Sequence, residues 1–136
     1  MIFLQLEEDK VIDLVEKTCN PDNEEGRWIS KIDLLERNGE LRLSEQSNVG
    51  KCKQECQTVS KACEESVAEV DTDLAELLWK DKLTLSKLIN EVCYSLSSVC
   101  TGKRPKLKAG ERKVDEDFSV MTEDEKKADD ILKQMR

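Results

Sequence analysis

The sequence predicts a mostly α-helical fold, a small bundle of helices held together by disulfides, and three observations support this. Aliphatic residues recur at helical spacing over most of the chain. Six cysteines occur in only 136 residues, which is typical of small disulfide-stabilised domains. Aromatic residues make up 4% and charged residues 38% of the chain, so the core must be aliphatic and small. This length suits one modest domain and a tail.

The first helix is expected over roughly 3–19, where apolar residues alternate with Glu and Lys at the spacing of an amphipathic helix. It should end near Cys19-Asn20-Pro21, because proline cannot continue a helix. The acidic stretch 21–26 then has the composition of an exposed loop.

A short β-hairpin is expected near 30–43. Ile32-Asp33-Leu34 and Leu41-Arg42-Leu43 alternate between apolar and charged residues, and Asn38-Gly39 stands between them. Both residues of such a pair accept the positive φ that a two-residue hairpin turn needs. A helix ending at Gly39 is the alternative, because Leu34-Leu35-Glu36-Arg37 also suits a helix.

The longest helical pattern covers 51–79, and a second helix is expected from about 84 to 100, closed by Gly102. A kink near 71 is expected in the first, because Asp71-Thr72-Asp73 can start a new helix. Together they form a helical hairpin, 51–100, within a domain that covers 1–100. The region 101–136 is a charged linker and a short C-terminal helix that starts at the capping box Thr122–Glu125, and we expect it to be mobile or loosely docked.

The cysteines are the candidate disulfide residues: Cys19, Cys52, Cys56, Cys63, Cys93 and Cys100. Residues seven apart on a continuous helix are separated by about 10.5 Å, beyond disulfide reach. Pairing among the three cysteines of 52–63 and within 93–100 is therefore excluded while those helices are intact. If the two long helices fold back on each other near residue 81, a disulfide between Cys63 and Cys100 is geometrically reasonable. Cys19 could then reach Cys52 or Cys56, and Cys93 would have no partner.

Catalysis and metal binding are not expected. Structural zinc sites and thioredoxin-type redox sites use Cys-x2-Cys pairs, but the spacings here are wider and the chain contains no histidine. There is no phosphate-binding glycine-rich loop and no nucleophile elbow. The net charge of −8 argues against nucleic acid as a partner. We expect no enzyme activity and no cofactor.

The even cysteine count favours an oxidising compartment, either the endoplasmic reticulum lumen or the extracellular space. The apolar start, Met1–Leu6, is too short for a signal peptide and runs directly into acidic residues. We therefore expect that the chain lacks an N-terminal segment. No stretch is long enough to span a membrane.

Several cysteine-anchored segments within roughly 11–118 resemble the Canopy family of saposin-like proteins. These segments are Gly50-Lys51-Cys52-Lys53-Gln54-Glu55-Cys56, Ala62-Cys63-Glu64-Glu65, Asp71-Thr72-Asp73-Leu74-Ala75-Glu76-Leu77, and Val92-Cys93 with Cys100. The resemblance implies a saposin-like helical fold stapled by disulfides. In that family a Cys-x2-Cys helix pairs with the last two cysteines, which implies that Cys93 and Cys100 lack partners here and that Cys19 pairs with Cys52 or Cys56.

The resemblance also implies a non-catalytic protein of the secretory pathway that assists the folding or trafficking of client or receptor proteins. The alternative is a saposin-type protein that binds lipid or membrane. Either partner is expected to contact one apolar face, made of Trp79, Leu85, Leu88, Val92 and Leu96.

Overall fold

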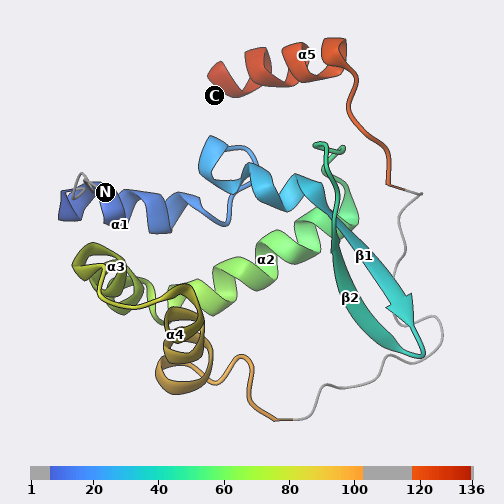
Figure 1. Cartoon of the computed structure of the whole chain (residues 1–136). Coiled ribbons are helices and arrows are strands. Elements are labelled where there is room, and N and C mark those ends of the chain that lie inside the picture. The colour runs from blue at the N-terminus through green and yellow to red at the C-terminus, as the bar shows by residue number, and fades with distance from the viewer. Residues whose placement is uncertain (1–6, 103–117, 136) are drawn as a thin grey trace.

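The computed structural model describes residues 7–102 and 118–135. Its long central helix, α2, has a β-hairpin at one end and two further helices at the other (Figure 1). The elements in chain order are α1 (Glu8–Lys17), the 3-10 helix η1 (Glu24–Lys31), β1 (Ile32–Arg37), β2 (Glu40–Glu45), α2 (Gln54–Ala68), α3 (Asp71–Lys80), α4 (Leu85–Asn90), the π-helical η2 (Glu91–Leu96) and α5 (Glu123–Gln134). The mostly helical fold with a small hairpin is confirmed.

The main core lies where α1 packs against α3. Val11 and Val15 of α1 and Ala75 of α3 are buried together. Four half-buried side chains surround them: Val67, Leu74, Leu78 and Trp79. All of these residues are aliphatic except Trp79, as the low aromatic content predicts. The four-residue spacing of the two valines puts them on one face of α1, which explains why this face turns towards α3.

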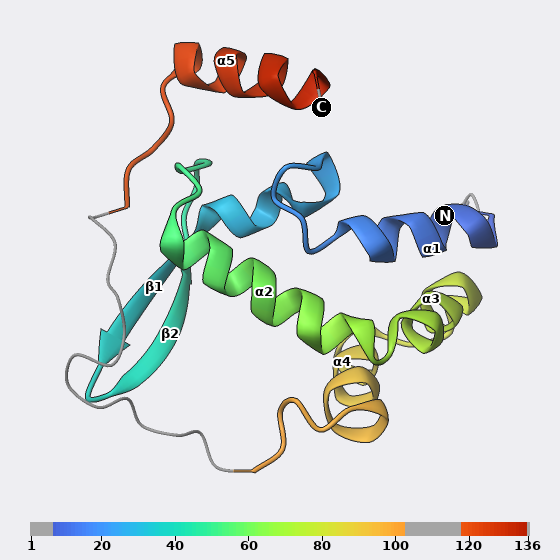
Figure 2. The ribbon, with the colours of Figure 1, turned by 180° about the vertical axis from the view of Figure 1, so that it is seen from behind.

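The 3-10 helix η1 was not expected from the sequence. It lies between α2 and α5 and makes contact with both α1 and α2 (Figures 1 and 2). Gly26 allows it to form, because a Cβ at this position would overlap with the backbone carbonyl of Asn20. Ile29 follows and is completely buried, while the Trp28 indole donates a hydrogen bond to the Thr18 carbonyl at 2.8 Å.

The hairpin prediction is confirmed, together with its turn. The two strands pair antiparallel, with Leu34 opposite Leu43 and Arg37 opposite Glu40. Asn38 and Gly39 have φ values of 54° and 79°, so both turn residues adopt the left-handed conformation that such a turn requires. The alternative of a helix ending at Gly39 is wrong.

The predicted helix over 51–79 is divided into α2 and α3, with the break at 69–70. A kink was expected near 71, and the structure confirms it. The helix also begins three residues later than predicted, at Gln54, so Cys52 lies before its first turn. Near its middle, the buried Ser60 hydroxyl donates to the Cys19 carbonyl at 2.7 Å and ties α2 to the end of α1.

The C-terminal helix α5 has the predicted capping box between Thr122 and Glu125. Polar contacts connect this helix and the residues before it to the rest of the described fold. Gly50 pairs with Val120, and ion pairs join Lys51 to Glu125 at 2.9 Å and Arg27 to Asp130 at 2.8 Å. The hydrogen bond from Lys51 lowers the pKa of the Glu125 carboxyl. Residues 103–117 of the expected linker lie outside the described residues.

Candidate functional site

The segment 83–99, which contains α4 and η2, exposes more apolar side chains than its surroundings. Its exposed members are Leu83, Leu85, Ile89, Tyr94, Leu96 and Val99. Leu85 is the most exposed of them, with 73% of its surface accessible, and five of the six residues of α4 are exposed. Single exposed apolar residues are ordinary, but a group of six within 17 residues marks a candidate contact surface.

Local hydrogen bonds determine the shape of this segment. Asp81 ends α3 in a left-handed conformation, and the Thr84 side chain caps α4 by accepting a hydrogen bond from the Lys87 amide at 3.3 Å. The chain then widens into the π-helical turns of η2. The Ser97 hydroxyl donates to the Val92 carbonyl at 2.7 Å, where the helix ends.

The expected helix over 84–100 is therefore too long. It ends at Leu96, because η2 is wider than an α-helix and the Ser97 side chain forms a hydrogen bond with the Val92 carbonyl of η2. Wider turns also change which residues share a face. This accounts for the mixed exposure along the segment.

The five residues of the expected apolar face do not lie in one environment. Leu85 and Leu96 are exposed, whereas Leu88 and Val92 are half-buried. Trp79 packs against the core cluster of α1 and α3. The exposed Ile89, Tyr94 and Val99 extend the surface in its place. Tyr94 was missed because a regular α-helix to residue 100 does not put it on the apolar face, whereas η2 is π-helical.

Two disulfides are present, and neither matches the expected pairings. Cys19 is bonded to Cys63, and Cys52 to Cys56. The expected Cys63–Cys100 bond and a bond from Cys19 to Cys52 or Cys56 are both wrong. The exclusion of pairing among Cys52, Cys56 and Cys63 assumed a helix from residue 51, whereas Cys52 precedes α2 and can approach Cys56. Two disulfides indicate maturation in an oxidising, non-cytosolic compartment.

Cys93 and Cys100 remain free thiols. Cys93 is half-buried and Cys100 is exposed. The Cys100 amide donates a hydrogen bond to the Cys93 carbonyl at 3.3 Å, which brings the two residues together at the end of the apolar segment. Burial raises the pKa of the Cys93 thiol, and a hydrogen bond with the Cys100 thiol adds to this rise.

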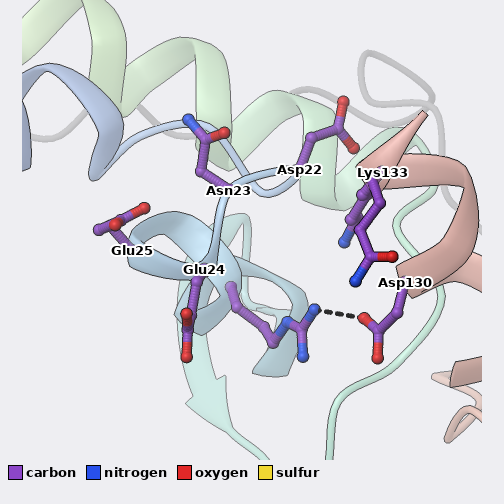
Figure 3. A pocket seen from close by; sticks show the side chains of 8 residues that line it. Asp22, Asn23, Glu24, Glu25, Asp130 and Lys133 are labelled. Atoms are coloured by element: carbon purple, nitrogen blue, oxygen red, sulfur yellow. Dashed lines mark hydrogen bonds and ion pairs between the residues drawn. The ribbon is translucent and has the colours of Figure 1, made fainter. Parts of the chain in front are cut away.

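A concave region lies between η1 and α5 (Figure 3). This open pocket has a volume of about 420 Å³, and its lining includes Asp22, Asn23, Glu24, Glu25, Arg27, Asp130, Lys133 and Gln134. Both of its basic groups are already engaged. Arg27 pairs with Asp130 at 2.8 Å, and Lys133 pairs with Asp129 at 2.7 Å and donates to the Pro21 carbonyl.

This pocket has the character of an ionic junction that holds α5 on η1. Its lining contains carboxylates and cations but no cysteine, serine or histidine that could act as a nucleophile with a base. Within the described residues, no group of three or more His, Cys, Asp or Glu side chains is arranged to hold a metal ion.

Neither a model of a known protein family, nor a curated protein, nor a solved structure matches this chain. Within the described part of the chain, no helix has the length and apolar character required to cross a membrane. The candidate site is therefore defined by its own geometry: an exposed apolar segment, 83–99, with a pair of free thiols at 93 and 100.

Proposed function

We propose that this protein is a non-catalytic, saposin-like protein of the secretory pathway that assists the folding or trafficking of client proteins. It acts in the endoplasmic reticulum lumen or after secretion, and it contacts clients through the apolar segment 83–99. The observation that carries this proposal is the exposure of six apolar side chains on one short segment. Unfolded or unassembled clients also expose apolar surface, so binding would remove both surfaces from water.

The two disulfides support the same proposal. Cys19–Cys63 joins the end of α1 to α2, and Cys52–Cys56 staples the start of α2. Both bonds lie outside the 83–99 segment. The disulfides thus constrain α1 and α2, whereas neither of them constrains the apolar segment 83–99. The side chains of this segment can therefore adjust to clients of different shape.

The test is binding of the full chain to reduced, carboxymethylated α-lactalbumin, a soluble unfolded polypeptide, measured by fluorescence anisotropy. The variant Leu85→Glu/Ile89→Glu should bind at least tenfold more weakly, because burial of one large aliphatic side chain contributes about 1.5–3 kcal/mol and about 1.4 kcal/mol corresponds to tenfold. The matched control is Ile131→Glu/Leu132→Glu, which changes two exposed aliphatic residues on α5 and should bind as the parent does.

Equal binding by the parent and the α4 variant would contradict the proposal. Vesicles of phosphatidylcholine and phosphatidylserine provide the second arm of the experiment. If the parent sediments with vesicles and does not bind the unfolded polypeptide, the segment serves lipid binding and the proposed client role is wrong.

A further inference from the structure

The two free thiols at the end of the apolar segment are closer than their spacing in sequence indicates. Seven residues along a regular helix separate two positions by about 10.5 Å. Here the helix ends at Leu96, and the turn at 97–101 reverses the chain. This turn is held by the Thr101 amide and hydroxyl, both of which donate to the Ser98 carbonyl, at 3.1 and 2.8 Å.

The turn brings Cys100 back onto Cys93. Its amide donates to the Cys93 carbonyl at 3.3 Å. The two thiols also form a hydrogen bond with each other, which adds to the raised pKa of Cys93. One backbone and one side-chain hydrogen bond therefore join the two residues, so a disulfide between them requires little rearrangement of the chain.

We propose that Cys93 and Cys100 form a redox-active dithiol that closes reversibly into a third disulfide by exchange with a small-molecule disulfide of the glutathione type. The expected exclusion of this pair rested on an intact helix to residue 100, and that helix is not present. The other four cysteines are bonded in the two disulfides, so Cys93 and Cys100 are the free thiols of the described residues. This inference does not depend on client binding.

The reaction proceeds in two exchange steps. The exposed Cys100, as its thiolate, attacks one sulfur of oxidised glutathione, which forms a mixed disulfide and releases one glutathione thiolate. The Cys93 thiol then loses its proton, attacks the Cys100 sulfur of the mixed disulfide and expels the second glutathione. Two protein thiols are oxidised, and one molecule of glutathione disulfide is reduced to two of glutathione.

The exposure of the two thiols assigns the order of the steps. Cys100 is exposed and accessible to a small disulfide, whereas Cys93 is half-buried. A half-buried thiol is a poor first nucleophile towards a solute but is well placed to attack a sulfur held beside it. The closed disulfide would fix the turn 97–101 against η2 and hold the carboxyl end of the apolar segment in one conformation.

The test is incubation of the folded full chain with glutathione disulfide, followed by alkylation with iodoacetamide and tryptic mass spectrometry. Residues 88–103 form one tryptic peptide that contains both cysteines. We expect this peptide to lose both alkylation sites and two hydrogen atoms, and reduced glutathione should restore them. Closure should occur at least tenfold faster than in guanidinium chloride, because the native turn preorganises the pair.

The variant Cys93→Ser provides the control for the second step. Its Cys100 should accumulate a stable mixed disulfide with glutathione, because the thiol that would attack it is absent. The proposal is overturned if the parent retains both thiols, if it carries glutathione on both, if it forms disulfide-linked dimers, or if native and denatured chains close at the same rate.

Discussion

Replacement of both Cys19 and Cys63 by alanine is expected to lower the free energy of unfolding by about 4 kcal/mol. The bond joins residues 44 positions apart and therefore restricts a large part of the unfolded chain. Its loss should also loosen the contact between α1 and α2, where the Ser60 hydroxyl binds the Cys19 carbonyl. Guanidinium chloride unfolding, followed by far-ultraviolet circular dichroism without a reducing agent, measures this difference.

The matched control is the double replacement of Cys52 and Cys56. This disulfide closes a separation of only four residues, so the same relation gives about 2 kcal/mol. Loss of the Cys19–Cys63 disulfide, which closes the longer loop, should therefore lower the free energy of unfolding more than loss of Cys52–Cys56. A smaller loss for the Cys19/Cys63 variant than for the Cys52/Cys56 variant would contradict the assignment of Cys19–Cys63 as the main covalent constraint.

The substitution Ile29→Ala is expected to destabilise the fold by about 3 kcal/mol. Ile29 is 0% exposed and lies in η1, which makes contact with both α1 and α2. Truncation removes three carbon atoms from a site that water does not reach and leaves a cavity. Thermal and denaturant unfolding of the full chain measure the loss.

A matched control is available because a second isoleucine lies on the surface. Ile12 of α1 is 40% exposed, so Ile12→Ala should cost under about 1 kcal/mol. The conservative change Ile29→Val should cost about 1 kcal/mol. If Ile29→Ala and Ile12→Ala had equal effects, the account of Ile29 as a packed residue that holds η1 on the fold would be wrong.

The elements that could be predicted from the sequence are those encoded by local chemistry. The Asn38-Gly39 turn, the Thr122–Glu125 capping box and the new helix start near Asp71 each depend on residues within a few positions of one another. For the same reason the mostly helical character and the hairpin near 30–43 were predicted correctly.

The features that were missed depend on contacts over long distances or on irregular helices. Arg27 and Asp130 are 103 positions apart, so no local pattern predicts the docking of α5 on η1. The disulfide pairing depended on helix ends, and shifts of a few residues at Gln54 and Leu96 changed which cysteines could meet. In the candidate site, Tyr94 is exposed within the π-helical turns of η2, and Val99 lies in the turn after η2, where a regular helix was assumed.

Central to this account is that the two disulfides constrain α1 and α2 and do not link them to the segment 83–99. Non-reducing tryptic mapping after alkylation tests this claim most directly. Peptide 18–27 should be joined to 62–80, peptide 52–53 should be joined to 54–61, and no disulfide should link 88–103 to any of them. A bond between peptides 62–80 and 88–103, or between 18–27 and either of 52–53 and 54–61, would contradict it.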